Sequence, residues 1–332
     1  MEKKKVGGLA SSVTEYFKTN FGILIAFLFL FVVMSLAAQN FFTNDNFLNI
    51  LRTVSTNFFL AAGIMMAIML MGIDLTCGSI VAFSGCITVL LLANCHMPIW
   101  ISILIGVISG AAVGFMNGMI IAYTGIHPFI VTLAMQSICR GAAYIVANGQ
   151  PISVDDDAFM NLGNGYLGPI PLPVIYMVIL LVLMFLLLNK TKMGRHIYAV
   201  GGNPTAAKFS GINISKVQIF VYTVSGLLAA FAGIVLASRL SSGQPDAGMG
   251  YETDAIAASV LGGTSFFGGT GTVGGMFIGV LVIGIINNGL NLLHVNSFWQ
   301  YVAKGAIILI AVYVDIYRSN RANKKLSKMA AK

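Results

Sequence analysis

Residues 173–188 read PVIYMVILLVLMFLLL, sixteen consecutive residues without a charge. A helix that crosses the bilayer core needs roughly 20 predominantly apolar residues, and this run nearly supplies them by itself. The residues that follow include Lys190, Lys192 and Arg195, and the loop that holds them contains no acid. Because lysine and arginine concentrate on the cytoplasmic side of a membrane, the stretch predicts a transmembrane helix that ends at a cytoplasmic loop.

The composition extends this interpretation to most of the 332 residues. Hydrophobic residues make up 57% of the chain and charged residues only 9%, whereas an average soluble domain carries about 25% charged residues. Since so few charges could not cover a water-exposed surface, we predict an all-α, polytopic membrane helix bundle of about ten transmembrane helices, in a single domain over residues 1–332. The predicted spans are residues 21–38, 54–72, 78–94, 98–122, 128–147, 173–188, 217–238, 254–265, 272–292 and 298–316.

The distribution of charge predicts the topology. Fifteen of the 19 Lys and Arg residues fall in residues 1–20, 189–216 and 317–332, so all three segments are expected in the cytoplasm, together with both termini. Six and four predicted spans separate them, and both numbers are even, as a shared location requires. The basic tail flanks a span and accompanies no soluble domain, so it does not indicate nucleic-acid binding. We expect a multi-pass protein of the bacterial inner (plasma) membrane, with residues 21–38 retained as a first span rather than cleaved as a signal peptide.

Two predicted spans are interrupted by turn-forming residues. Gly72, Ile73 and Asp74 separate the second span from the third. Two glycine-rich groups, residues 262–265 and 268–271, interrupt the short eighth span and the stretch after it. Transporters place non-helical backbone of this kind against a cavity, but a plain short loop between two helices explains the pattern equally well. Residues 254–271 therefore form either a full span or a re-entrant segment.

Several polar residues fall inside predicted spans, where they are costly and often functional. Amides and an arginine offer the donors and acceptors that sugar hydroxyls need, so these residues could line a translocation path. The candidates are Arg140, Gln136, Asn117, Asn287, Asn288 and Asn291. The alternative for each asparagine is a hydrogen bond between helices, and the alternative for Arg140 is a structural clamp on backbone carbonyls.

Two further charged residues have structural interpretations. Asp74 lies at the end of a span, where its carboxylate could cap the next helix. Lys304 lies near the start of the last span and could extend its amine to the membrane surface as an anchor.

The sequence contains no pattern that indicates catalysis. It has no GxxxxGK[ST] phosphate-binding loop, no HExxH motif and no Cys/His spacing typical of a metal site. We therefore expect no catalytic residue, metal or cofactor, and the cysteines are interpreted as small apolar residues. Mid-span acids that could couple transport to an ion gradient are also scarce. The rival functions are a secondary sugar carrier, which needs such acids, a channel, and a membrane enzyme.

The cytoplasmic loop of residues 189–216 contains the pattern of a short helix over residues 205–210. Asn203 is a typical N-cap and Pro204 suits the first helical position, while Gly211 can end the helix. We predict that this helix docks an energy-supplying partner. The residues assigned to this coupling are Gly202, Asn203, Pro204, Thr205, Ala206, Ala207 and Gly211, with Ala206 and Ala207 as the flat docking face.

The loop sequence GRHIYAVGGNPTAAKFSGI resembles the cytoplasmic coupling loop of the ribose/galactoside-type monosaccharide ABC permeases. Thr205, Ala206, Ala207 and Gly211 match the EAA-x-x-x-G signature of permeases, with Thr205 where glutamate is typical. Further stretches resemble the same family in the same order along the chain. They read FFTNDNFLNIL, GIDLTCGSI, NGMIIAYTGIHPFIVTLAM, GYETDAIAASVLGGTSFFGGTGTVGG and NNGLNLLHVNSFWQYVAKGAIILIAV.

The resemblance implies the membrane subunit of an ATP-driven importer for a monosaccharide, with ribose as the nearest substrate. Galactose, allose, xylose, inositol and furanose signal molecules stay open as alternatives. It also implies an all-helical importer fold and a set of partners that composition does not show. They are a cytoplasmic ATPase with two nucleotide-binding halves, a periplasmic or extracellular sugar-binding protein, a second copy of the chain in a homodimer, and membrane lipid.

Overall fold

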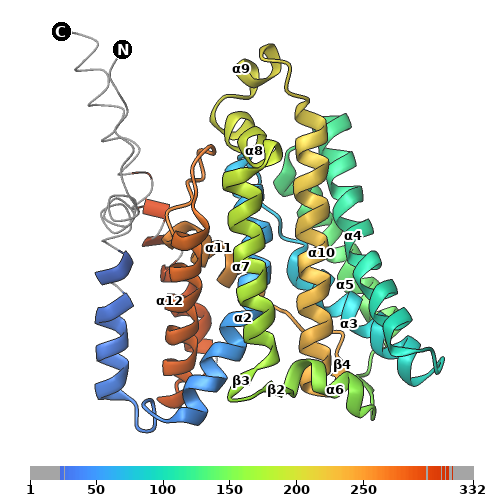
Figure 1. Cartoon of the computed structure of the whole chain (residues 1–332), viewed down its shortest axis with the longest axis vertical. Coiled ribbons are helices and arrows are strands. Elements are labelled where there is room, and N and C mark those ends of the chain that lie inside the picture. The colour runs from blue at the N-terminus through green and yellow to red at the C-terminus, as the bar shows by residue number, and fades with distance from the viewer. Residues whose placement is uncertain are drawn as a thin grey trace.

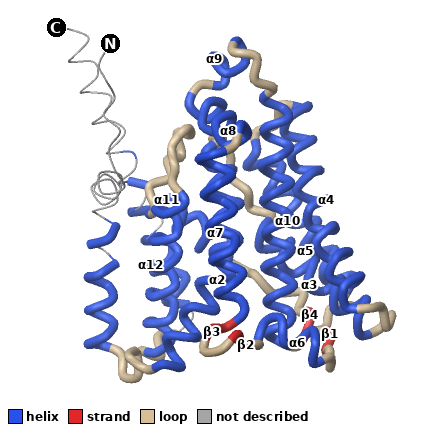
Figure 2. The backbone as a smooth tube through the Cα atoms, viewed as in Figure 1, coloured by secondary structure: helices blue, strands red, loops and turns tan. Residues whose placement is uncertain are grey.

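The computed structural model describes residues 23–316, except residues 26, 297, 308, 311, 314 and 315. The described part is a bundle of helices with four two-residue strands at one end (Figures 1 and 2). The helices are α2 (Asn44–Met69), α3 (Cys77–Ala93), α4 (Ile99–Thr124), α5 (Pro128–Val146), α6 (Asp157–Asn164), α7 (Leu172–Lys190), α8 (Lys192–Gly202), α9 (Pro204–Phe209), α10 (Ile214–Leu240), α11 (Tyr251–Leu261) and α12 (Val273–Leu292). Residues 23–25 and 27–37 are also helical, as are residues 298–307.

Six of these helices are long and apolar enough to cross a membrane, namely α2, α4, α5, α7, α10 and α12. The prediction of a helical membrane bundle is confirmed at this level. The outer faces of α4 and α7 leave large apolar side chains such as Leu104, Ile108, Val182 and Leu183 exposed, as expected where a helix meets lipid. Helix α3 is also apolar but is shorter, with 17 residues, and is not among these six.

Two predicted boundaries differ from the observed helices. Helix α2 begins at Asn44, ten residues before the predicted span, because Thr43 caps it by accepting a hydrogen bond from the Asn46 N–H. Helix α11 has only 11 residues and ends before Gly262. At 1.5 Å per residue it is about half as long as the roughly 30 Å hydrocarbon core, so residues 254–265 do not form one continuous helix.

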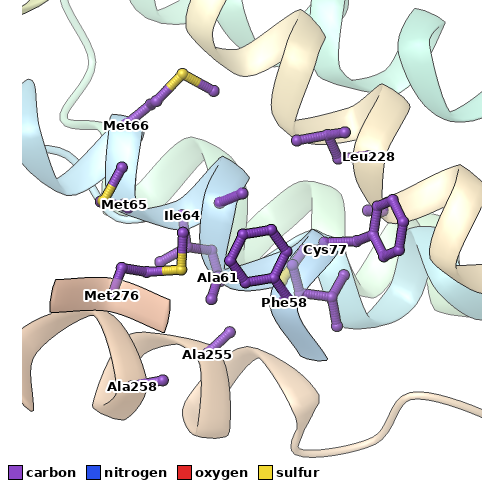
Figure 3. Packing of buried hydrophobic residues seen from close by; sticks show 14 of the residues in the cluster. Phe58, Ala61, Ile64, Met65, Met66, Cys77, Leu228, Ala255, Ala258 and Met276 are labelled. Carbon is purple, nitrogen blue, oxygen red and sulfur yellow. The ribbon is translucent and has the colours of Figure 1, made fainter. Parts of the chain in front are cut away.

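Helix α2 occupies the centre of the described bundle. Its side chains from Val54 to Met69 are almost completely buried. Figure 3 shows Phe58, Ile64 and Met65 packed among side chains of α11 and α12 on one side, and Leu228 of α10 on another. Bulky, flexible methionines fill the irregular spaces between these helices. The central position of α2 brings its few polar residues into the interior rather than into contact with lipid.

Helices α4 and α10 pack closely in antiparallel directions. Gly110, Gly114 and Gly118 of α4 meet the backbone of α10 at Gly226, Tyr222 and Ile219, in that reversed order, and a Cβ at any of the three α4 positions would lie within 2.8 Å of α10. Small residues permit this approach of two membrane helices. The start of α10, next to α9, therefore lies at the same end of the bundle as the end of α4.

The opposite end of the bundle carries the strands and α6 (Figure 1). Strand β1 (Ile152–Ser153) pairs antiparallel with β4 (Ser242–Gly243), and β2 (Tyr166–Leu167) pairs with β3 (Ile170–Pro171). The first pair joins the long connection after α5 to the end of α10. It fixes the starting point of the irregular segment that leads to α11.

Candidate functional site

Two irregular segments meet inside the bundle. Residues 70–76 connect α2 to α3, and residues 244–250 connect β4 to α11. Gly78 and Gly248 allow them to approach: a Cβ on Gly78 would lie 2.5 Å from the Gly248 carbonyl oxygen and 2.3 Å from Glu252 Oε2. No side chain larger than hydrogen fits at Gly78 without moving backbone. The first turns of α3 and α11 are thereby held against each other.

Arg140 of α5 binds this junction through backbone carbonyls. Its Nη1 donates to the carbonyl oxygens of Pro245 (2.8 Å) and Ala247 (2.7 Å), and its Nη2 donates to Gly78 (3.2 Å). These are three of the five N–H groups of a guanidinium. The carbonyl clamp that we gave as the alternative for Arg140 is therefore present, and the side chain also borders a cavity.

The cavity beside Arg140 has a volume of about 420 Å³ and is lined by Ser79, Gln136, Ser137, Arg140, Met249, Gly250 and Glu252. We call it the Arg140 cavity. Its volume falls in the range of small-molecule sites, about 300–1,000 Å³. Gln136 Nε2 donates to Glu252 Oε1 at 3.4 Å. The Ser79 hydroxyl and Glu252 Oε2 are buried without a hydrogen-bond partner among the described residues, so the cavity offers free donors and acceptors to a polar ligand.

Asp74 belongs to a separate buried network. Its carboxylate accepts hydrogen bonds from the Thr76 N–H (3.0 Å), from the Thr76 hydroxyl, and from the Ser225 hydroxyl of α10 (2.7 Å). Asn117 of α4 donates to the Thr76 hydroxyl oxygen at 2.9 Å. Asp74 thus accepts a backbone N–H just ahead of α3 and also joins that segment to α10. Asn117 lies between helices in this network and does not line the Arg140 cavity.

The three asparagines of α12 have three different partners. Asn287 Nδ2 donates to Asp254 Oδ2 (2.9 Å), Asn288 exchanges hydrogen bonds with Asn46 of α2 (2.7 and 3.2 Å), and Asn291 accepts one from Gln300 (2.9 Å). All three contacts join α12 to another segment. The structure therefore brings Arg140 and Gln136 together in one cavity, while the asparagines lie elsewhere.

The interpretation of Lys304 as a membrane-surface anchor is wrong. Its ammonium forms an ion pair with Asp254 of α11 at 2.9 Å, and the Asp254 side chain is only 4% exposed. The expectation that acids are nearly absent from the spans is also wrong, because Asp254, Glu252 and Asp74 all lie inside the bundle. In the described part of the chain, no group of three or more His, Cys, Asp or Glu residues is placed to hold a metal ion.

The predicted short helix is present as α9. Asn203 caps it by accepting a hydrogen bond from the Ala206 N–H at 2.9 Å, Pro204 occupies its first turn, and Gly211 has a φ of +81° after its end. The assignment of Ala207 to the docking face is wrong, because its side chain is buried and only 4% exposed. Ala206 and Thr205 are exposed as expected, and Phe209 is 88% exposed.

Helix α8, which leads into α9, is anchored to the bundle. A Cβ on Gly201 would lie 1.8 Å from the Met69 carbonyl oxygen at the end of α2, whereas Gly202 has open space around it. Tyr198 donates a hydrogen bond to the Gly271 carbonyl oxygen at 2.7 Å, and burial raises the pKa of its phenol above the ordinary value. The phenol therefore keeps its proton at physiological pH, and α8 is bonded to the connection between α11 and α12.

Four residues of functional interest were missed from the sequence. Ser79, Ser137 and Glu252 line the Arg140 cavity, and Phe209 is the exposed apolar residue of α9. Glu252 follows directly on a polar, glycine-containing stretch next to a short apolar run, which is a signal for a residue at the start of a broken helix. Ser79 and Ser137 carry no comparable signal.

The described bundle, with its broken helices around a polar cavity and a capped helix projecting at one end, has the features of a membrane permease. Residues 46–312 match the family described as branched-chain amino acid transport system / permease component, and the chain belongs to this family. The ribose import permease protein RbsC of Haemophilus influenzae is 42% identical over 88% of this chain and 92% of its own length.

Two further relatives are named for ribose and for D-allose. RbsC of Bacillus subtilis is 44% identical over 90% of this chain and 93% of its own length. The D-allose transport system permease protein AlsC of Escherichia coli is 39% identical over 85% of this chain and 86% of its own length. The resemblance to the monosaccharide ABC permeases is thus confirmed. No solved structure matches the chain.

Proposed function

We propose that this chain is the permease subunit of an ATP-binding cassette importer and carries a monosaccharide, ribose or a related pentose or hexose, across the bacterial inner membrane. The observation that carries the proposal is the long similarity to permeases named for ribose and D-allose. The Arg140 cavity supports it, because the buried Ser79 hydroxyl and Glu252 Oε2 lack partners and are suited to the hydroxyls of a sugar.

We further propose ten spans, with both termini and the α8–α9 region in the cytoplasm. Each of the ten predicted segments overlaps a described helix or helical residues, which supports that number. The short α3 and α11 would begin within the membrane beside the Arg140 cavity. The basic residues Lys190, Lys192 and Arg195 near α9 favour the cytoplasmic side for that end.

The energy would come from a cytoplasmic ATPase with two nucleotide-binding halves, docked on α9. The exposed, capped helix with Phe209 at its tip is a suitable contact for such a partner. A periplasmic or extracellular sugar-binding protein would deliver the sugar at the opposite end, where β1–β4 lie. Two copies of the chain would form the pore in the lipid membrane.

The test is reconstitution of this chain in liposomes with the ATPase and the secreted binding protein encoded beside it. We expect uptake of one of D-ribose, D-allose or L-arabinose that requires all three components and ATP. Uptake by this chain alone, driven by an ion gradient, would instead establish a secondary carrier. If no pentose or hexose is taken up while the ATPase is functional, the monosaccharide assignment is contradicted.

A further inference from the structure

A second cavity lies across the irregular segment from the Arg140 cavity. It has a volume of about 330 Å³ between α2, α10 and residues 244–251. We call it the α2–α10 cavity. Its polar lining consists of Thr53, Thr56 and Asn57 of α2, Arg239 of α10, Gln244, and Tyr251 at the start of α11. None of these residues belongs to the Arg140 cavity.

The Asn57 side chain shows that this cavity is built for a polar ligand. It lines the cavity, is 5% exposed, and its Oδ1 has no hydrogen-bond partner among the described residues. A buried amide oxygen without a donor is unfavourable, and nearly all buried polar groups in proteins find partners. The free oxygen therefore indicates that a donor group is supplied from the cavity.

The other polar groups supply donors around the same space. Arg239 uses one nitrogen to donate to Asn49 Oδ1 at 2.9 Å, and Gln244 Nε2 donates to the Ser242 hydroxyl oxygen at 3.1 Å. Both side chains keep further N–H groups. The lining contains no Asp or Glu. A ligand must therefore donate to Asn57 and also accept from Arg239 or Gln244.

Sugar hydroxyls meet this requirement, since each can both donate and accept. An ionised carboxylate suits Arg239 but supplies only acceptors, so it leaves Asn57 Oδ1 unpaired. We propose that the α2–α10 cavity is a binding site for a neutral polyhydroxylated ligand. Under the proposed function, on which this inference rests for the identity of the ligand, it holds the monosaccharide on its way to the Arg140 cavity.

The segment between the two cavities explains how one site could lead to the other. Ala247, Gly248 and Tyr251 line the α2–α10 cavity, whereas Met249, Gly250 and Glu252 line the Arg140 cavity. The α2–α10 cavity adjoins the end of α10 that lies opposite α9. Both cavities therefore border the same irregular segment.

The experiment compares Asn57→Leu and Asn57→Asp in the complete reconstituted transporter. Leucine removes the acceptor at similar volume, and aspartate keeps an acceptor. We expect Asn57→Leu to lower maximal uptake of the transported sugar about tenfold, while ATPase stimulation by sugar-loaded binding protein stays within twofold of wild type. Asn57→Asp should retain most of the uptake. Asn189→Leu, at the exposed end of α7, is the matched control and should transport normally.

Each result decides one question. Uptake by Asn57→Leu within twofold of wild type overturns the site. Uptake that falls further in Asn57→Asp than in Asn57→Leu also overturns it. That result would indicate an anionic ligand, because the added negative charge would repel an anion but not a neutral sugar. If Asn57→Leu does not reach the membrane, Thr53→Val serves instead and should lower uptake severalfold. A wild-type transporter that imports no monosaccharide contradicts the proposed function itself, whereas normal wild-type uptake with unaffected variants contradicts only this site.

Discussion

The Arg140 side chain leaves α5 and reaches carbonyl oxygens on two other segments, at Pro245, Ala247 and Gly78. The carbonyls of Pro245 and Ala247 lie in irregular backbone, so they have no helical partner, and inside a membrane they have no water either. A guanidinium can satisfy several of them at once because its donors are fixed in a planar fork. One residue thus stabilises the non-helical backbone that borders both cavities.

Replacing Arg140 should therefore affect folding and transport together. Arg140→Gln removes three hydrogen bonds and leaves carbonyls that cost about 1–3 kcal/mol each if unsatisfied. We expect a lower unfolding temperature in detergent and lower uptake, with Arg140→Lys intermediate because an ammonium cannot span all three carbonyls. Ser137→Ala, in the same cavity, is the control and should unfold like wild type. Lost uptake with an unchanged unfolding temperature would show that Arg140 acts on the substrate rather than on the backbone.

Helix α9 has a buried side and an exposed side. Ala207 packs inward, and Phe209 extends outward with 88% of its surface accessible. An aromatic ring so exposed is unfavourable unless a partner covers it, and isolated aromatic residues commonly anchor protein interfaces. The helix is held at a defined place because Gly201 of the preceding helix touches the end of α2.

We predict that Phe209 anchors the ATPase. Burial of a phenylalanine contributes about 1.5–3 kcal/mol, so Phe209→Ala should weaken co-purification of the ATPase about tenfold or more without changing the unfolding temperature of the permease. Phe209→Leu keeps an apolar side chain and should retain most of the association. If both variants bind the ATPase as wild type does, the contact with this partner lies elsewhere on the cytoplasmic surface.

The sequence predicted elements better than contacts. Long apolar runs and the Asn203–Pro204 cap determine local structure, so the positions of the helices and of α9 follow from neighbouring residues. Ala207 is buried because of the segments that pack against the six-residue α9, and its own sequence does not specify them. The Arg140 clamp joins Arg140 to residues more than 100 positions away. Neither has a local pattern. For Lys304 a surface position was the simpler prediction, because its partner Asp254 is 50 positions away.

At the scale of the whole molecule, the bundle has two chemically different ends. The antiparallel packing of α4 on α10 places the connection between α3 and α4 at the end opposite α9. Basic residues gather around the α9 end. At the other end, the acids Asp155 and Asp156 lie in the connection between β1 and α6, and Asp157 is the first residue of α6. The positive-inside rule predicts that the α9 end is cytoplasmic, and the two cavities would then be reached from outside through the end that carries the strands.

The cysteines allow this orientation to be measured in the native chain. Cys95 is exposed in the connection between α3 and α4, whereas Cys77, Cys86 and Cys139 are buried, so the protein carries one reactive thiol in its described part. We expect a membrane-impermeant maleimide to label the wild type in intact spheroplasts. Cys95→Ser should abolish labelling, which controls for the buried thiols. In that background Thr205→Cys, on the exposed side of α9, should react only after the membrane is permeabilised.

The reverse pattern, with Thr205→Cys reactive from outside and Cys95 protected, would invert the topology. It would place α9 where no cytoplasmic ATPase could reach it, and ATP-driven import through this helix would be excluded.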